Sequence, residues 1–173
     1  MNSINFYIFQ QINGIAGQYY WLDFAGIFCA EYLEYVLIFC LFLFLIKNFK
    51  KYWQMVFQAF SAGIIARLFF TEIIRWILPK PRPFVENNVN LLISHSSSPS
   101  FPSGHASFYF ALSSIIYFYN KKLGCVFLFA SFLICLGRVF CGIHWLFDIF
   151  AGALLGIFTG FFVVKFFQRY LNN

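Results

Sequence analysis

Five long apolar segments, separated by short polar loops, dominate this sequence and limit the folds that it can adopt. They cover roughly residues 20–46, 52–78, 103–119, 123–140 and 143–167. A transmembrane α-helix needs about 20 mostly apolar residues, because in hydrocarbon its backbone groups can only bond one another. Charged residues make up 10% of the chain, whereas a soluble domain has roughly 25%. We therefore predict an all-α integral membrane helix bundle of about five transmembrane helices, forming one domain over residues 1–173.

The N-terminal segment differs from the five apolar ones. Residues 1–16 carry no charge, and asparagine and glutamine interrupt their apolar positions. A signal peptide starts with basic residues and continues as an unbroken apolar core, and this segment has neither. We predict a short N-terminal helix that lies in the membrane interface.

The basic residues fall into two groups, and this division predicts the orientation of the chain. Seven of them lie at one set of segment ends: Lys47, Lys50, Lys51, Lys121, Lys122, Lys165 and Arg169. The positive-inside rule places these ends in the cytoplasm. The others lie inside segments or at the opposite ends: Arg67, Arg75, Lys80, Arg82 and Arg138. We therefore predict a multi-pass protein of the cytoplasmic (inner) membrane, with its functional residues facing outside, towards the periplasm.

The motif Pro102-Ser103-Gly104-His105 follows a serine-rich loop and opens the third apolar segment. Ser103 can cap a helix that starts here, and Gly104 lets a ligand approach the backbone closely. The first N–H groups of a helix favour an anion. An ordinary capped helix start is the alternative interpretation of this tetrapeptide.

Two further cations, Lys80 and Arg82, lie where prolines end the second apolar segment. Arg82 offers a planar fork and Lys80 a point charge, and both suit phosphate oxygens. A basic loop beside a membrane is alternatively an interfacial anchor, so these two residues alone do not decide between the interpretations.

A third cluster begins at Arg138, which lies six residues before His144, and Asp148 follows His144 by four. At this spacing on a helix, the carboxylate can reach one imidazole nitrogen and leave the other free as a nucleophile. A buried pair that only links helices is the alternative. A metal site is disfavoured, because the candidate ligands lack the spacing of zinc motifs and lie among arginines; these candidates are Glu86, His95, His105, His144 and Asp148.

Together, the three motifs resemble the signature of the type-2 phosphatidic acid phosphatase superfamily, membrane lipid phosphatases that share their site with vanadium haloperoxidases. The matching residues are Arg75-x6-Arg82-Pro83, Pro102-Ser103-Gly104-His105 and Gly137-Arg138-x5-His144-x3-Asp148. Their order and spacing match over residues 75–148. Two positions depart from the family pattern: Arg75 stands in place of the usual lysine, and Gly137 in place of the usual serine.

The resemblance implies a role for each site residue. His144 is implied as the nucleophile, Asp148 as its partner and His105 as the general acid to the leaving oxygen. The implied phosphate-binding groups are Arg75, Arg82, Ser103, the Gly104 amide, Arg138 and Lys80. Either Arg75 or Lys80 takes the place of the first-motif lysine, and the spacing favours Arg75.

Within this superfamily, the chain is further similar to bacterial undecaprenyl pyrophosphate phosphatases, through its short length, Phe84 after Arg-Pro, and the acidic first segment with Glu31 and Tyr32. The implied reaction is hydrolysis of undecaprenyl diphosphate to undecaprenyl phosphate through a phosphohistidine, without metal or cofactor. Phosphatidylglycerol phosphate, lipid A and phosphatidic acid are alternative substrates. A phospholipid binder or transporter is a further alternative, but it has no need of the His144 to Asp148 spacing. The implied partners are the lipid phosphate and the bilayer, with no nucleic acid.

The acidic first segment lies outside the three motifs. At 1.5 Å per helical residue, Glu31 and Arg67 are both about 15 Å below the outer end of their segments. Charges so deep in a membrane are costly unless they are paired, so we predict an ion pair between Glu31 and Arg67 that braces Arg75. Glu34, about one turn deeper, is the competing partner, and Glu31 alternatively lines a polar path.

Overall fold

The computed structural model describes residues 3–171 as a helix bundle, with no strand in that range. The first crossing consists of α2 (Tyr20–Ile27), the π-helical turn η1 (Phe28–Tyr32) and α3 (Leu33–Lys47). The second consists of α4 (Phe49–Ile64), the π-helical turn η2 (Ile65–Thr71) and α5 (Glu72–Ile77). The other helices are α1 (Ser3–Asn13), α6 (Pro83–Glu86), α7 (Gly104–Tyr119), α8 (Lys121–Phe140) and α9 (Leu146–Leu171).

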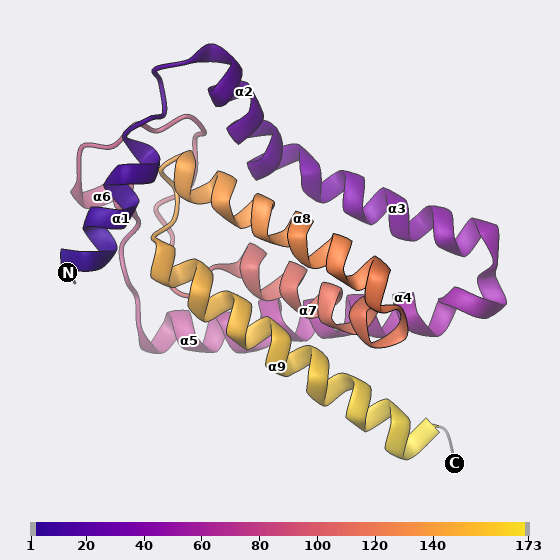
Figure 1. Cartoon of the computed structure of the whole chain (residues 1–173). Coiled ribbons are helices and arrows are strands. Elements are labelled where there is room, and N and C mark those ends of the chain that lie inside the picture. Colours follow the sequence, from indigo (N-terminus) through magenta and orange to yellow (C-terminus); the bar gives the residue numbers. More distant parts are fainter. Residues whose placement is uncertain (1–2, 172–173) are drawn as a thin grey trace.

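The predicted all-α membrane bundle is confirmed. By length and composition, four helices can cross a membrane: Tyr20–Lys47, Phe49–Ile77, Lys121–Phe140 and Leu146–Arg169. The fifth predicted crossing corresponds to α7, which has 16 residues and packs between α4, α8 and α9. The starts of α2, α7 and α9 lie at one end of the bundle, and the end of α9 lies at the other (Figure 1).

Single asparagines connect two pairs of helices at the end of the bundle that carries the clustered lysines. Asn48, between α3 and α4, accepts a hydrogen bond from Lys51 N at 3.1 Å. Asn120, between α7 and α8, accepts one from Leu123 N at 3.0 Å. A capping side chain provides a partner for an N–H group that has none within the first helical turn. The connections can therefore be as short as one residue.

Glycines allow α9 to lie directly on α7. A Cβ at Gly152 would lie 2.6 Å from Ser103 O, and one at Gly156 would collide with Ser107 O. Small residues four apart are a common means of close approach between membrane helices. The close packing also joins the two helix starts, because Ser103 N donates to Asp148 O at 2.9 Å. Residues of two different motifs are thereby fixed relative to each other.

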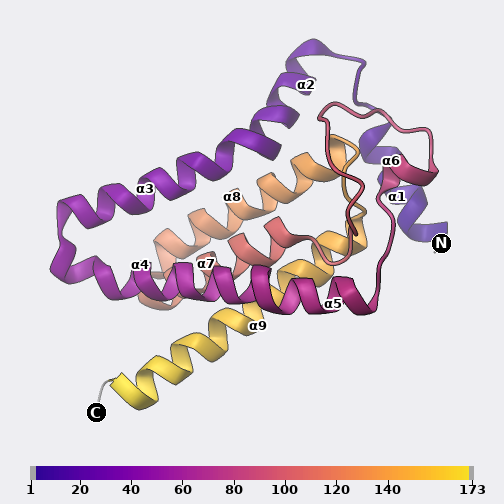
Figure 2. The same ribbon diagram turned by 180° about the vertical axis from the view of Figure 1, so that it is seen from behind.

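The first crossing packs least tightly. Only 17% of its most apolar window is buried, compared with 50% for α8. Figure 2 shows that α2 and α3 lie away from α5 and approach the second crossing only at the α3–α4 turn. Most of this crossing is therefore available to lipid, and its polar residues need a reason to face inwards.

α1 packs against helix ends and the long loop. Phe9 is 1% exposed, and its ring centroid lies 5.0 Å from that of Trp145. Asn13 Nδ2 donates to Asn90 O at 2.8 Å. The predicted N-terminal helix exists, while its place in the membrane interface stays a prediction. Residues 1–2, which that prediction included, lie outside the described residues.

Candidate active site

The three sequence motifs meet at the end of the bundle where the long loop lies. Lys80 and Arg82 follow α5, Ser103 precedes α7, Arg138 lies near the end of α8 and His144 lies just before α9. Figure 1 shows these helix ends gathered together, although the chain between the first and the last of these residues is long. The short turns at the opposite end hold the helices parallel and so bring these ends together.

His144 and Asp148 form the buried centre of the site, with exposed fractions of 1% and 0%. His144 Nδ1 lies 3.5 Å from Asp148 Oδ2, a long contact. The same carboxylate oxygen accepts a hydrogen bond from Trp145 N at 3.0 Å, at the start of α9. Asp148 therefore caps α9 and faces the imidazole, but at this distance the buried Nδ1 makes no hydrogen bond within the described residues.

A guanidinium on the far side of the ring determines the tautomer of His144. Arg82 Nη1 lies 3.1 Å from His144 Nε2. Arginine can only donate, so Nε2 carries the lone pair and Nδ1 carries the proton that points to Asp148. Burial, above all, lowers the pKa of His144 to about 3, so the ring is neutral at physiological pH. A neutral imidazole whose Nε2 carries no proton is the form that a nucleophile requires, although in this structure that lone pair faces the Arg82 guanidinium.

Backbone groups hold Arg82 in this position. Its Nη1 also donates to Ile143 O at 3.0 Å, and its Nε donates to Ser98 O at 3.0 Å. Arg82 is only 2% exposed. Burial and then the charge of Arg75 lower its pKa to about 10, which leaves the guanidinium charged. The serine-rich loop thus fixes the Arg82 guanidinium against the His144 ring.

Lys80 neutralises Asp148 instead of facing open space. Its Nζ lies 2.9 Å from Asp148 Oδ1, and the side chain is 31% exposed. The carboxylate thus has a cation on one oxygen and the imidazole on the other. This arrangement favours the ionised form of Asp148, and it shows a contact of Lys80 that the sequence did not predict.

Arg75 holds the start of α7. Its Nε and Nη2 donate to Pro102 O at 3.3 and 3.2 Å, and its Nη1 lies 3.0 Å from Glu72 Oε1. Ser103 Oγ accepts from Ala106 N at 3.4 Å, as the sequence predicted for the cap. The phosphate contacts predicted for Arg75 and Lys80 both stay predictions.

Arg138 is held by the first crossing. Its Nη2 donates to Ala30 O in η1 at 3.0 Å. Its buried Nε has no hydrogen-bond partner among the described residues, and the phosphate contact predicted for Arg138 stays a prediction. A Cβ at Gly137 would lie 2.8 Å from Ala30 N and 2.9 Å from Gly26 O. Glycine in place of the family's serine therefore lets η1 approach α8 and hold Arg138.

His105 lies between residues of the first two crossings. Its Nε2 lies 3.2 Å from Glu34 Oε2, and its Nδ1 lies 3.5 Å from Arg67 Nη1. Its side chain and that of Glu34 are 18% and 15% exposed. The same arginine covers the start of α7, because a Cβ at Gly104 would lie 3.1 Å from Arg67 Nη1.

The predicted ion pair between Glu31 and Arg67 is wrong. Within residues 3–171, Glu31 makes no ion pair with Arg67. The charge of Glu31 acts on Arg138, on the α8 side of the first crossing. The prediction assumed that two charged residues at equal depth in the membrane pair with each other. The direction in which each side chain points around its helix decides which groups meet. The competing acid, Glu34, is the one that faces α7.

Glu34 and Arg67 were not recognised as site residues in the sequence. Neither belongs to a motif, and both were interpreted as structural ions. The sequence feature that could have identified Arg67 as a site residue was the spacing of Arg67, Thr71 and Arg75 along one helical face. In the structure, all three face α7 or the loop before it. Thr71 Oγ1 lies 2.9 Å from Ser107 Oγ, on the same side as the other two contacts.

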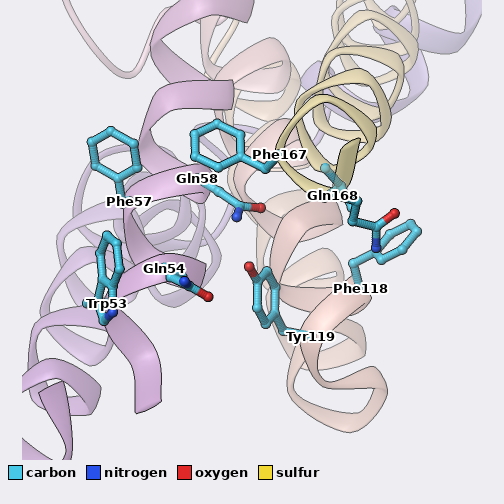
Figure 3. Close-up of a pocket in the computed structure, with 9 residues that line it drawn as sticks. Trp53, Gln54, Phe57, Gln58, Phe118, Tyr119, Phe167 and Gln168 are labelled. Carbon is cyan, nitrogen blue, oxygen red and sulfur yellow. The ribbon is translucent and has the colours of Figure 1, made fainter. Parts of the chain in front are cut away.

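A cavity at the opposite end of the bundle has a different character. It has a volume of about 330 Å³ and is lined by Trp53, Gln54, Phe57, Gln58, Phe118, Tyr119, Val164, Phe167 and Gln168. Figure 3 shows its lining side chains. Its lining contains no histidine, lysine or arginine. It therefore lacks both a nucleophile of the predicted kind and a phosphate-binding cation.

Comparison with known proteins agrees with this geometry. The family model described as "PAP2 superfamily" matches residues 51–171, which is more than half of the chain. The chain belongs to the PAP2 superfamily. The bacitracin transport permease protein BcrC of Bacillus licheniformis is 32% identical over 163 residues, covering 94% of this chain and 80% of that protein. The undecaprenyl-diphosphatase BcrC of Bacillus subtilis (strain 168) is 30% identical over 165 residues, covering 94% and 84%.

The crystal structure of Aquifex aeolicus LpxE has a similar fold, with a TM-score of 0.77 and 26% sequence identity. The match covers 94% of this chain and 96% of that one. This PAP2 protein is thus a multi-pass membrane lipid phosphatase, a hydrolase whose substrate is a lipid phosphate in the bilayer. The roles of its individual residues stay predictions, as does the expectation that no metal takes part.

Proposed function

We propose that this PAP2 protein hydrolyses undecaprenyl diphosphate to undecaprenyl phosphate at the outer face of the cytoplasmic membrane, through a phosphohistidine at His144. The main support is the pair of contacts on that ring. Asp148 faces Nδ1 at 3.5 Å and Arg82 faces Nε2 at 3.1 Å, so the lone pair lies where a phosphate oxygen would meet the guanidinium. A structural pair has no need of a cation on the second nitrogen.

The proposed reaction has two steps. His144 Nε2 attacks phosphorus in line, while Arg82, Arg138 and the first amides of α7 stabilise the equatorial oxygens. His105 gives its proton to the leaving oxygen. Water then attacks the phosphohistidine, and His105 takes a proton from that water. The whole chain acts in this proposal as one domain.

A long isoprenoid tail fits the surface beside the site. Next to Lys80 lies a cavity of about 490 Å³ whose other lining residues are Ile77, Leu78, Pro79, Phe101 and Phe147. A lipid with its phosphates on the cations could place its first tail carbons there. The name of the relative in Bacillus subtilis supports a diphosphate substrate over phosphatidylglycerol phosphate, lipid A or phosphatidic acid.

Purified protein in detergent tests the substrate. We expect kcat/KM for undecaprenyl diphosphate to exceed that for the three alternative lipids, and His144→Ala to remove activity on all of them. A higher kcat/KM for one of the alternatives would overturn the substrate assignment and leave the phosphatase site intact.

Stereochemistry at phosphorus tests the intermediate. Two displacements through His144 retain the configuration of a chiral thiophosphate substrate, whereas direct attack by water inverts it. Inversion would exclude the phosphohistidine. Rapid acid-free quenching with a radiolabelled terminal phosphate should also label the protein transiently, and His144→Ala should remain unlabelled.

The orientation is testable with cysteines at the two ends of the bundle. We expect Asn88→Cys, in the loop beside the site, to react with an impermeant thiol reagent in intact cells. Asn48→Cys, in the α3–α4 turn, is the matched control and should react only after lysis. The opposite result would place the site on the cytoplasmic face.

A further inference from the structure

His105 has the same kind of surroundings as His144, but residues of other helices provide them. Its Nδ1 faces the guanidinium of Arg67 from η2, and its Nε2 faces the carboxylate of Glu34 from α3. Tyr109 on α7 also interacts with Glu34. Glu34 is thus held at a fixed place beside His105, deep in a crossing that is mostly exposed to lipid.

These contacts define which nitrogen of His105 carries the proton. Because a guanidinium can only donate, Nδ1 is the acceptor and Nε2–H points to Glu34. A general acid needs a second proton, and Nδ1 is the nitrogen that can receive it. The Arg67 Nη1 atom that faces Nδ1 is also the atom nearest to a Cβ built at Gly104, at the anion-favouring start of α7.

We infer that Glu34, Arg67 and His105 form the leaving-group subsite of this phosphatase, which fits an anionic leaving group such as the second phosphate of a lipid diphosphate. Glu34 is a positioning residue that orients His105 and balances the charge of its imidazolium. Arg67 binds the leaving phosphate. The assignment rests on the proposed transfer to His144.

The contact between Arg67 and His105 explains how substrate binding would allow His105 to become protonated and act as the general acid. The contact between Arg67 Nη1 and His105 Nδ1 is long, at 3.5 Å, and therefore weak. A phosphate oxygen is a better partner for a guanidinium than a neutral imidazole, since both groups are then charged. When Arg67 turns to the leaving phosphate, Nδ1 is released and takes up a proton from water, so that His105 is an imidazolium before the chemical step.

The chemical step balances with these groups. The bond between phosphorus and the leaving oxygen breaks as His144 Nε2 bonds to phosphorus, and the leaving oxygen takes the Nδ1 proton of His105. In the second step, the attacking water transfers a proton back to Nδ1. Glu34 remains ionised throughout and stabilises His105 in its charged form.

A comparison of leaving groups tests Glu34. We expect Glu34→Gln to lower kcat at least about tenfold for a long-chain alkyl phosphate, whose alkoxide needs a proton, and less than about threefold for p-nitrophenyl phosphate, whose leaving group departs as an anion. His105→Ala should show the same pattern.

The matched control is Glu31→Gln, which removes an acid of the same crossing that does not touch His105. It should leave the ratio of the two activities unchanged. An equal loss on both substrates in Glu34→Gln would show a merely structural role and overturn the assignment. An unchanged rate on both would overturn it as well.

A comparison of diphosphate and monophosphate tests Arg67. We expect Arg67→Met to lower the ratio of kcat/KM for a prenyl diphosphate to that for the matching monophosphate at least about tenfold, roughly 1.4 kcal/mol. Arg67→Lys should recover part of that ratio, because it restores the charge. A ratio unchanged in Arg67→Met would overturn the role of this arginine.

The two proposals can fail separately. If the wild-type protein prefers another lipid over undecaprenyl diphosphate, the proposed substrate is wrong. The alkyl and aryl phosphates still decide the role of Glu34, because that test does not use the natural lipid. If the wild-type protein prefers the diphosphate and neither variant changes its ratio, only the leaving-group subsite is wrong.

Discussion

The two histidines of the site have matching chemical partners but differ in how they are held. Both lie between a carboxylate and a guanidinium. His144 lies in the turn before α9 and Asp148 in the first turn of α9, and both are buried. His105 depends on Glu34 and Arg67, which come from two other crossings, and it keeps some exposure.

This difference fits the two tasks that the mechanism assigns. A nucleophile has to be aimed at one phosphorus atom, so burial and contacts within one helix end suit it. A general acid has to meet a leaving group that enters and departs, so an accessible side chain suits it. The loosely packed first crossing can move relative to α7 more easily than α9 can, because less of its surface is buried.

The largest expected effect comes from removing the proposed nucleophile, His144. His144→Ala should lower kcat at least about 10⁴-fold, because removal of a covalent nucleophile leaves only binding and electrostatic stabilisation. Phosphate release from lipid substrate is the measurement, with thermal unfolding as the control for folding. Activity of the unchanged protein should survive EDTA, and loss of activity that a divalent ion restores would contradict this mechanism.

The next effect concerns the packing that holds Arg138. Gly137→Ser restores the family's usual residue, yet its Cβ would lie 2.8 Å from Ala30 N. We expect this variant to lose about 1–3 kcal/mol of stability and to lose activity, since overpacking displaces η1 and Arg138. The melting temperature and kcat report the two effects. Higher activity in the serine variant would show that the hydroxyl, and not the close packing, matters here.

The burial of His144 predicts a pH dependence of stability. With its pKa lowered to about 3, the folded ring resists protonation, while the unfolded ring titrates near its ordinary value. Stability should therefore fall as the pH decreases below about 6.5, by roughly 2 kcal/mol at pH 5. His144→Asn cannot titrate there, so the wild-type stability should fall relative to this variant over the same range. A constant difference between the two proteins would show that His144 is not held neutral.

The smallest effect concerns the first-motif cation. Arg75→Ala should lower kcat/KM about tenfold, whereas Arg75→Lys, which restores the family's usual residue, should keep much of the activity. Arg75 acts on the Pro102 carbonyl as well as on the predicted phosphate, so the alanine variant tests both contacts. Full activity in Arg75→Ala would assign the role to Lys80.

The structure assembles the nucleophile side from residues that the sequence had already identified. His144 and Asp148 are four residues apart as on a helix, but His144 lies in the turn before α9, and that turn, capped by Asp148 on Trp145 N, brings the two side chains together. Arg82 and Ser103 were recognisable because they lie in motifs with fixed order and spacing. Glu34 and Arg67 had no such pattern, and the depth argument chose Glu31 as the partner of Arg67 in place of Glu34.

The sequence by itself determined the class of fold, the approximate crossings and the chemical types at the site, because these depend on hydrophobic length and on local spacing. Only the tertiary structure decided that Glu34 faces His105, that Lys80 lies on Asp148 and that Gly137 lets η1 reach Arg138. These contacts depend on the rotation of each helix about its axis and on the π-helical turns η1 and η2, which alter the helical register. Side-chain direction around a helix is set by packing against its neighbours, and a single apolar sequence contains little information about that packing.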